Sequence, residues 1–490
     1  MSTFHATFDM PCDVHALYQW HARPGALERL TPPWQRVHVA ERRRGQDHPR
    51  IGNGAIARLM IGIGPLSMPW VAEHFDHDPP HGFSDRQLSG PFGRWVHRHA
   101  FIDAGDGSSR LDDRIEYDAP GGMLGSTVLG GKLAADLDRL FWFRHARTRQ
   151  DLARHARSDG PLSVAIAGSS GMIGSALAAF LSTGGHHVIR LVRGRAVPDP
   201  VDGIEQRHWD PAAHEISPYT LAGVDAVVNL CGENIASGRW TDKRKTQLER
   251  SRIGPTSLLA RAIASLPAAD RPAVLVNASG VHAYGDRGDE PLDESSGWGD
   301  GFLPGLVRKW EAATRPAESA GVRVVHARFG MVLGAHGGAL KALLTPTRLG
   351  LGGPIGSGRQ WWPWIGLDDA VGAVHHAIAS ADVSGALNIC APNAATANDV
   401  TSAVAEAARR PAILGLPAGA ARTLLGEEMA ADMLLASTRA EPTRLGEHGF
   451  RWMHPTLADA IGWELGCRRL MDQTSGAAQP RVAANAQETA

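Results

Sequence analysis

Cysteine is scarce in this chain, and the few cysteines form no close pair in the sequence. Cys12, Cys231, Cys390 and Cys467 lie far apart, without a CxxC motif. This distribution fits a reducing compartment better than a disulfide framework or a cysteine-based zinc site. The N-terminus also lacks the basic segment and apolar core of a signal peptide. We therefore predict a cytoplasmic protein.

Long apolar runs and an excess of charge of either sign are lacking as well. No stretch approaches the ~20 apolar residues that span a bilayer, so we expect no membrane span. The net charge of −1 argues against a nucleic acid or an anionic membrane as a partner. The remaining expectation is a globular protein that acts on a small-molecule substrate.

At 490 residues the chain is too long for one ordinary core, and three regions separate. Residues 1–155 combine alternating stretches, such as "RWVHRHAFID" and "RLDDRIEYDA", with a long helical pattern from Leu129 to Phe141. This predicts an α+β domain in which a sheet is closed by a C-terminal helix. A polar stretch that ends in Gly160 and Pro161 is a good linker.

The second region, 161–388, alternates helical patterns with short apolar runs such as "SVAIAG" and "DAVVNLCG". Runs without alternation are typical of strands buried on both faces, so we predict a doubly wound parallel sheet, an α/β Rossmann fold. Residues 389–467 form a small helical C-terminal lobe, interleaved with the second region from about residue 339. The small and polar tail, 471–490, is predicted to be disordered.

The stretch "VAIAGSSGMIGSALAAFL" carries three glycines between a predicted strand and a predicted helix. The first glycine allows a tight turn, the second lets the backbone approach a pyrophosphate, and the third lets helix and strand pack closely. The spacing is GxxGxxG, and an ordinary turn is the alternative. The predicted cofactor contacts are Gly168, Ser169, Ser170, Gly171, Met172, Ile173 and Gly174.

The end of the next predicted strand selects between the two nicotinamide cofactors. An acidic residue there would bind the ribose 2′-hydroxyl of NAD, whereas an arginine would accommodate the 2′-phosphate of NADP. The stretch "HHVIRLVRGR" contains no acid and ends in Arg193 and Arg195. We therefore favour NADP(H) over NAD(H), with Arg193 as the phosphate contact. The alternative is a solvated strand end.

These residues resemble the short-chain dehydrogenase/reductase superfamily of the extended type. More narrowly, the chain is similar to the atypical branch of NAD-dependent epimerase family proteins. The resemblance covers 161 to about 465 and rests on "AGSSGMIGSAL", "ARFGMVLGAHGGAL", "RLGLGGPIGSGRQWWPWIGLDDAV", "GFRWMHPTLADAI" and "VNLCGENIASGRWTDKRKTQLERSRI". The last part resembles the C-terminal DUF1731-like domain of this branch. The resemblance implies further cofactor contacts at Leu230, Cys231 and Gly232.

The first region, 1–155, resembles the SRPBCC or START-like helix-grip domains that some members of the branch carry in fusion. The stretches "HARPGALERLTPPW" and "LSGPFGRWVHRHAF" and the long helix carry this likeness. Helix-grip domains enclose an apolar cavity between sheet and helix. The resemblance therefore implies a hydrophobic ligand in the N-terminal domain, with a merely packed module as the alternative.

The catalytic pair of the superfamily, a tyrosine with a lysine four residues further on, is missing. The lysine normally lowers the pKa of the tyrosine so that it can act near neutral pH. The four tyrosines are Tyr18, Tyr117, Tyr219 and Tyr284, and the residues four positions later are Ala22, Gly121, Gly223 and Gly288. In "GFLPGLVRKWEAAT", aligned on Glu311, the pair falls on Leu303 and Val307. Neither residue can transfer a proton.

Three other polar residues are candidates for the chemistry. Ser279 follows a predicted strand where the superfamily places a substrate-binding hydroxyl, and the alternative is a hydroxyl that satisfies nearby backbone. Tyr284 is a candidate proton donor, although without a lysine its pKa stays near ~10. Glu233 would be a general base if burial raised its pKa, with a helix cap or a salt-bridge partner as the alternative.

Arginine and tryptophan residues suggest where a substrate binds. Arg359 matches a substrate-region arginine of the superfamily, which typically holds a phosphate or carboxylate. Arg328 resembles another motif arginine, with a structural ion pair as the alternative, and Trp361 and Trp364 are candidate pocket walls. We expect Asp368 and Asp369 to cap the helix that follows.

Histidine is frequent, but its pattern does not favour a metal. His97 and His99 share a predicted strand face beside aromatic residues, so we interpret them as a hydrogen-bonded pocket lining and expect no metal.

Two functions follow from these predictions. The first is an NADP(H)-dependent oxidoreductase or epimerase acting on a small molecule through Ser279 and a non-standard acid or base. The second is a non-catalytic NADP(H) sensor or hydrophobic-ligand-binding protein that works through the START-like domain. The resemblance is also compatible with a homodimer, since superfamily members often pair through a four-helix bundle.

Overall fold

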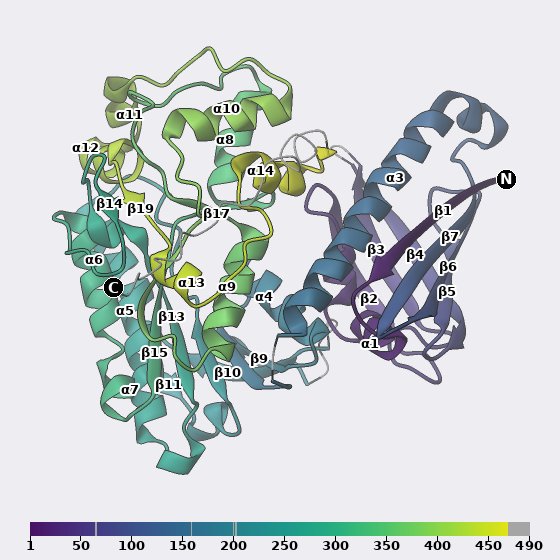
Figure 1. The fold of residues 1–490 in the computed structure, drawn as a ribbon, viewed down its shortest axis with the longest axis horizontal. Helices are drawn as coiled ribbons and strands as arrows, with labels where there is room; N and C mark the ends of the chain where they lie inside the picture. Colours follow the sequence, from purple (N-terminus) through teal and green to yellow (C-terminus); the bar gives the residue numbers. More distant parts are fainter. Residues whose placement is uncertain (64–65, 158, 199, 201–202, 469–490) are drawn as a thin grey trace, which may run out of the picture.

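The computed structural model describes residues 1–468 except 64–65, 158, 199 and 201–202. The predicted tail 471–490 lies outside these residues. Figure 1 shows two lobes, one built from the first third of the chain and one from the rest. In the described part of the chain, no helix is both long enough and apolar enough to cross a membrane.

The first lobe is a seven-stranded antiparallel sheet in the order β1-β7-β6-β5-β4-β3-β2. Each of the strands β2 to β6 pairs with the next strand along the chain. The last strand of this series, β7, also pairs with β1, which becomes the edge strand. The strands are β1 (Ser2–Met10), β2 (Arg36–Arg43), β3 (Ile56–Ile63), β4 (Leu66–Asp78), β5 (Gly82–Ser89), β6 (Arg94–Gly105) and β7 (Ser108–Asp118). Helices α1 (Val14–Ala22) and α2 (Ala26–Leu30) connect β1 to β2.

The long helix α3 (Gly122–His155) follows β7 and lies across this sheet (Figure 1). Its apolar side chains recur every three or four residues, so they form one stripe that can face the sheet. Leu137 and Phe141 of this stripe are buried against Trp95, Ile115 and Tyr117 of β6 and β7. The predicted alternation of these two strands is confirmed, since Ile115 is fully buried while Arg114 and Glu116 beside it are less so.

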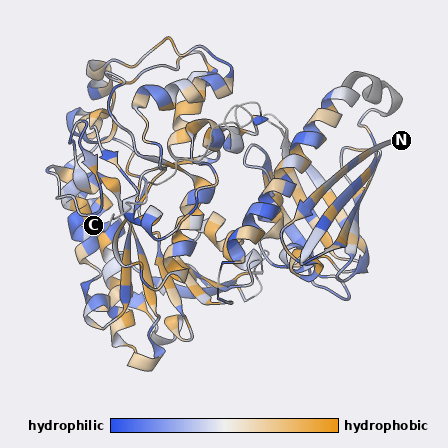
Figure 2. Cartoon of the chain, in the orientation of Figure 1, coloured by the Kyte–Doolittle hydropathy of each residue, from blue (hydrophilic) through white to orange (hydrophobic). Residues whose placement is uncertain are grey.

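The second lobe contains the predicted Rossmann-type sheet, whose strand order is β11-β10-β9-β8-β12-β13-β15-β18. All neighbouring pairs are parallel except the edge pair β10 and β11. The strands are β8 (Ser163–Ala167), β9 (His187–Val192), β10 (Glu205–Asp210), β11 (Glu215–Ile216), β12 (Ala226–Asn229), β13 (Val274–Gly280), β15 (Arg323–Phe329) and β18 (Gly385–Ile389). Their apolar residues pack on both faces, as Figure 2 shows by the orange strands and adjoining helices.

Helices cover the two faces of this sheet. They are α4 (Met172–Thr183), α5 (Asp242–Ser265), α6 (Phe302–Ala312), α7 (Arg315–Ser319) and α9 (Leu367–Ala379). The strand order reverses at β8, which lies between β9 and β12. In such sheets the ligand crevice lies beyond the carboxyl ends of the strands at this reversal.

The remaining helices form a smaller layer around a separate apolar cluster. This cluster joins α8 (Gly338–Arg348), α10 (Ala397–Ala408) and α14 (Leu457–Leu465) through Leu340, Val400 and Ile461. Short elements complete the layer: β16 (Met331–Gly334), β17 (Trp364–Gly366), α11 (Ala418–Leu425), α12 (Glu427–Ala430), α13 (Thr443–Glu447) and the pair β14 (Pro291–Leu292) and β19 (Arg439–Ala440).

The two lobes are joined by a buried network of ion pairs. Arg29 of α2 and Arg147 of α3 both bind the carboxylate of Asp368 in the first turn of α9. Arg154 of α3 binds Asp369, with 2.5 Å between Nη2 and Oδ1. All five side chains are less than one-tenth exposed. The prediction that Asp368 and Asp369 cap their helix is therefore wrong, because both carboxylates are used by arginines of the other lobe.

Candidate cofactor and substrate site

The glycine-rich turn after β8 has the backbone geometry that its sequence predicts. Gly168 has a φ of +77°, and an added Cβ would come within 2.7 Å of the Leu230 carbonyl. A Cβ at Gly174 would lie 2.3 Å from the Gly168 carbonyl oxygen, so this glycine lets α4 approach the turn. A Cβ at Gly171 would meet no atom closer than 3.3 Å. Its exposed backbone is open to an approaching ligand.

The first turn of α4 adds hydrogen-bond donors to this surface. Its N-cap is Gly171, which supplies no capping side chain. The N–H groups at the start of a helix lack partners within the helix, and the helix dipole there favours negative charge. Ser170 and Gly171 are exposed, whereas Ser169 is buried and Met172 and Ile173 are half-buried. The turn therefore suits a phosphate group.

Arg193 lies at the carboxyl end of β9, beside the same turn. Its charge acts on the thiol of Cys231, which directly follows Leu230. Burial nevertheless raises the pKa of Cys231 to about 12, so that the thiol is inert at neutral pH. Arg193 is exposed and makes no hydrogen bond or ion pair with any residue that the structure describes. Arg193, Cys231 and the glycine turn thus border one region.

Buried amides and hydroxyls fix the ends of the neighbouring strands. Asn229 of β12 donates to Asn277 of β13 and to Thr256 of α5, both over 2.8 Å. Thr256 also accepts a hydrogen bond from the indole of Trp310 on α6. Asn229 and Thr256 are fully buried, so every polar group here needs such a partner. The sequence analysis missed this network, since isolated Asn and Thr residues carry no recognisable signal.

Ser279, at the end of β13, belongs to a second buried network that contains three of the predicted residues. Its hydroxyl donates to Glu311 Oε1 over 2.6 Å. Arg328 of β15 holds both oxygens of Glu311 at 2.8 and 2.9 Å. The same arginine donates to the Tyr284 hydroxyl over 3.1 Å. Ser279, Tyr284 and Arg328 are therefore brought together, with Glu311 between serine and arginine.

The position of Tyr284 does not suit a proton donor. The side chain is fully buried, and its hydroxyl donates to Asn388 over 2.7 Å while it accepts from Arg328. Burial raises its pKa to about 12, although Arg328 acts in the opposite direction. Both hydrogen-bonding capacities of the hydroxyl are occupied by protein groups. The arrangement is that of a structural tyrosine.

Glu233 has the opposite electrostatics from those of a general base. Its carboxylate is bound by Arg244, and Gln247 donates to Oε1 over 2.9 Å. The hydrogen bond from Arg244 is the main reason why its pKa is lowered. The side chain is 40% exposed, and burial, which acts in the opposite direction, has a smaller effect than the hydrogen bond from Arg244. The geometry supports the alternative reading of Glu233 as a salt-bridge partner.

The predicted substrate residues do not form one group. Arg328 is 5% exposed and committed to Glu311, in agreement with the structural alternative. Arg359 is exposed, and its side chain makes no hydrogen bond or ion pair with the residues that the structure describes. The Trp361 indole donates to Asp289 over 2.9 Å. Trp364 is 1% exposed and belongs to the apolar cluster of the small layer. Leu303 and Val307, at the positions of the missing catalytic pair, are buried core residues.

Two further residues that the sequence analysis did not select border the ends of these strands. Arg252 of α5 donates to the Glu233 carbonyl over 2.8 Å and lies against Gly232. Burial lowers the pKa of the nearby His282 to about 4, and the charge of Arg252 adds to this effect. His282 is therefore neutral at physiological pH.

The fold and the glycine turn define a Rossmann-type, dinucleotide-binding protein of the short-chain dehydrogenase kind. The family model of the NAD dependent epimerase/dehydratase family matches residues 164–390, and DUF1731, a domain of unknown function, matches 416–464. The chain is 45% identical over 300 residues to an epimerase family protein of Mycobacterium tuberculosis. The aligned residues cover 61% of this chain and 96% of that protein. The chain therefore belongs to the NAD-dependent epimerase/dehydratase family.

Human and bacterial relatives extend the comparison. The human epimerase family protein SDR39U1 is 38% identical over 302 residues, or 61% of this chain and 98% of that protein. Its crystal structure with NADPH has a TM-score of 0.55 and covers 61% of this chain. The crystal structure of a nucleoside-diphosphate sugar epimerase from Corynebacterium glutamicum is 31% identical, has a TM-score of 0.75 and covers 98% of this chain and 94% of that one. That similarity includes both lobes.

Proposed function

We propose that the second lobe binds NADP(H) and uses it to oxidise, reduce or epimerise a small molecule. The observation that carries this proposal is the open glycine turn with the unengaged Arg193 beside it. The pyrophosphate would lie on the backbone of Ser170 and Gly171 at the start of α4. Arg193 would hold the 2′-phosphate, since a guanidinium forms charge-assisted hydrogen bonds with such a group. The NADPH in the structure of human SDR39U1 supports this choice of cofactor.

The chemistry that the cofactor supplies is hydride transfer at its nicotinamide ring. On the protein side, we assign the substrate oxygen to Ser279. Its proton points to Glu311 over 2.6 Å, which leaves the oxygen lone pairs of Ser279 free to accept a hydrogen bond from a substrate hydroxyl. As that hydroxyl becomes a carbonyl, its proton passes to Ser279 Oγ and the serine proton passes to Glu311. Arg328 keeps the Glu311 carboxylate in place.

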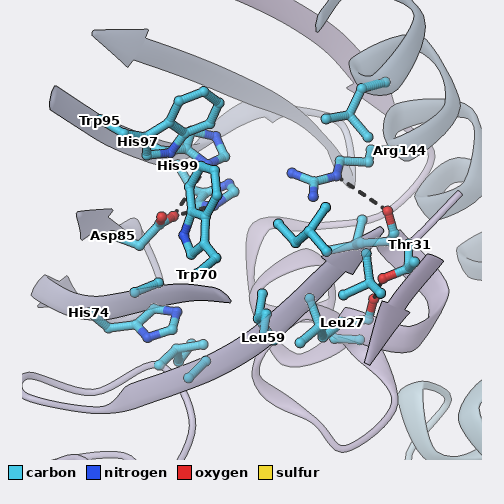
Figure 3. Close-up of a pocket in the computed structure, with 18 of the residues that line it drawn as sticks. Leu27, Thr31, Leu59, Trp70, His74, Asp85, Trp95, His97, His99 and Arg144 are labelled. Atoms are coloured by element: carbon cyan, nitrogen blue, oxygen red, sulfur yellow. Dashed lines mark hydrogen bonds and ion pairs between the residues drawn. The ribbon is translucent and has the colours of Figure 1, made fainter. Parts of the chain in front are cut away.

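We propose that the first lobe, residues 1–155, is a START-like helix-grip domain that takes up a hydrophobic ligand. A cavity of about 370 Å³ between the sheet and helices α2 and α3 supports this role. Its apolar wall includes Leu27, Leu59, Ile61, Met68 and Trp70. Figure 3 shows Leu27 and Leu59 on one side of this space and Trp70 and Trp95 on the other. Volumes of this size are typical of small-molecule sites.

The nucleotide proposal is tested by titration with NADPH and NADH, followed by quenching of the tryptophan fluorescence. Gly171→Asp places a side chain and a negative charge in the open turn, so we expect it to abolish binding of both nucleotides. Arg193→Asp is expected to weaken NADPH at least about tenfold more than NADH, which corresponds to the loss of one charge-assisted contact. Arg261, exposed on α5, donates to Ser257 and to no other residue in the described part of the chain, and it provides the control Arg261→Asp.

If the wild-type protein binds neither nucleotide, the proposal fails. If Arg193→Asp weakened the binding of NADPH and NADH equally, only the proposed preference for NADP(H) would be contradicted. Once a substrate is found by screening, Ser279→Ala is expected to lower kcat while nucleotide binding stays unchanged. Unchanged turnover in Ser279→Ala would exclude the assigned proton path.

A further inference from the structure

A compact cluster of histidines and carboxylates lies on the sheet surface that faces the cavity of the first lobe. His97 and His99 are two residues apart on β6, so their side chains share one face. Asp85 of β5 lies directly opposite His97 in the strand register, and Asp113 of β7 lies directly opposite His99. The register therefore places one carboxylate on each side of the histidine pair.

The nitrogen atoms that face Asp85 are close enough to share one cation. His97 Nδ1 lies 3.3 Å from Asp85 Oδ2, and His99 Nε2 lies 3.7 Å from the same oxygen. All three ligand atoms are within 4.8 Å of one another. Ligands of a transition metal lie about 2.0–2.2 Å from the ion, so such spacings surround a position that a single ion can occupy.

The other ring nitrogens of both histidines are directed to Asp113. His97 Nε2 lies 3.1 Å and His99 Nδ1 lies 2.6 Å from Asp113 Oδ1. The second oxygen of Asp113 is held by His145 of α3 at 2.6 Å. A carboxylate that accepts the far N–H of a histidine fixes the tautomer in which the near nitrogen carries a lone pair. The hydrogen bond from His97 to Asp113 thus directs the lone pair of His97 Nδ1 toward Asp85, while His99 contacts Asp113 as an ion pair.

This cluster is shielded from bulk water but opens into the cavity. The side chains of His97 and Asp113 are about 4% and 3% exposed, and those of His99 and Asp85 are 10% and 16% exposed. Asp85, His97 and His99 all line the cavity. Figure 3 shows these three side chains at one end of it, with Arg144 across the space.

We propose that Asp85, His97 and His99 bind one divalent transition-metal cation, such as Zn²⁺ or Fe²⁺, with open coordination positions toward the cavity. Two imidazoles and one carboxylate on one side of an ion leave the opposite positions for exogenous ligands. Arg144 lines the same cavity and donates to the Leu30 carbonyl over 3.2 Å. A ligand with an anionic oxygen would be drawn to the metal and to Arg144, while its apolar part contacts the leucine wall.

A second histidine cluster in the described part of the chain is a poorer site. His155, His186 and His375 also have ligand atoms within 4.8 Å of one another. His186 Nδ1, however, accepts a hydrogen bond from the Leu162 N–H over 3.1 Å, so its Nε2 must carry the proton. A protonated ring nitrogen cannot bind a metal. The cavity cluster has no such conflict.

The alternative for the cavity cluster is a set of hydrogen bonds balanced by protons. Burial alone would lower the pKa of His99, but the carboxylates of Asp113 and Asp85 raise it to about 9. In that state one proton takes the place of the cation between the carboxylates. The two states are distinguished by measuring the metal itself.

The test uses the full-length, tag-free protein, stripped with a chelator and titrated with Co²⁺ in the absence of nucleotide. We expect one equivalent of Co²⁺ to bind with visible d–d absorption, and Zn²⁺ to displace it. Asp85→Asn and His99→Gln are expected to abolish this absorption. Asp113→Asn, which removes only the outer carboxylate, is expected to weaken Co²⁺ binding by about 10–100-fold.

The matched control is His5→Gln. His5 of β1 pairs with Asp112 at 2.8 Å on the outside of the same sheet, and its loss should leave the absorption unchanged. His155→Gln controls for the second histidine cluster. Far-ultraviolet circular dichroism shows whether each variant is folded, and NADPH titration reports separately on the second lobe.

The absence of Co²⁺ absorption in the folded wild-type protein would overturn the proposal. So would absorption that survives in folded Asp85→Asn and His99→Gln, or that is lost in His155→Gln. None of these outcomes depends on whether the second lobe binds NADP(H).

Discussion

At the scale of single residues, a tyrosine or an arginine can be catalytic or structural, and its hydrogen-bond partners and burial determine which role it has. The sequence predicts Tyr284 and Arg328 as site residues, yet both are buried. The Tyr284 hydroxyl donates to Asn388 and accepts from Arg328. Glu311 is placed between Arg328 and Ser279, although its sequence position marks only an alignment point. The surroundings of these side chains come from β13, α6, β15 and β18, and no local motif records them.

The structural role of Tyr284 gives a prediction that separates it from a proton donor. Tyr284→Phe removes the hydroxyl that joins Asn388 and Arg328. Because two buried polar groups then lose a partner, we expect the free energy of unfolding to fall by about 1–3 kcal/mol. Denaturant unfolding measures this loss, and NADPH affinity should remain unchanged. A stable variant without turnover would instead favour the catalytic role.

Glu464 of α14 gives a prediction for pH. Burial, with Asp368 as a second cause, raises its pKa to about 8, although its carboxylate accepts from the Ala335 N–H over 2.8 Å. Between pH ~4.5 and 8 the folded protein therefore holds a proton that the unfolded chain has released. Stability must fall as pH rises through this window, by at most about 1.4 kcal/mol per unit.

Glu464→Gln keeps the hydrogen bond from Ala335 and removes the titration. The variant is expected to lose this part of the pH dependence and to be more stable than the wild type near pH 8. Unfolding free energies measured from pH 5 to pH 8.5 check this expectation. Parallel curves for the two proteins would contradict it.

At the scale of elements, the sequence predicts the helices and strands well, but it does not predict strand register or the contacts between the two lobes. The apolar runs predict the parallel strands, and the glycine spacing predicts the turn between β8 and α4, because both are local patterns. The pairing of Asp85 with His97 depends on the register of β5 and β6, which no local pattern fixes. Asp368 and Asp369 looked like helix caps because their partners are more than two hundred residues away.

The contact between α9 and α3 gives a prediction for stability. Asp368→Asn removes the carboxylate that binds the buried guanidinium of Arg147, which otherwise packs against the rings of Phe143 and Trp463. Removal of one partner from a buried ion pair typically costs about 3–5 kcal/mol. We expect a loss of this size in denaturant unfolding.

Asp138→Asn is the matched control for this experiment. Asp138 pairs with Arg468 at 2.8 Å, and both side chains are largely exposed. Its loss should change stability by less than about 1 kcal/mol. Similar losses of unfolding free energy in the two variants would show that the buried ion pairs stabilise the protein no more than an exposed pair does.

At the scale of the whole molecule, two lobes with different chemistry share one helix. One part of α3 lines the cavity of the first lobe through Leu133, Leu137 and Arg144. The part that follows docks on α9 through Arg147 and Arg154. A relative that matches only the second lobe, such as human SDR39U1, contains the Rossmann part without this partner.

The interface also contains aromatic side chains that each lobe hides in the other. Phe143 of α3 packs on Trp463 of α14 with 4.6 Å between ring centroids, and His155 stacks on Phe180 of α4 at 4.3 Å. A gene that lost either half would leave the other half with these rings and several charges facing water. Such a surface promotes aggregation. Deletion of one lobe would therefore have to be accompanied by several substitutions on the surface of the lobe that remains. This requirement favours retention of the two-lobe chain.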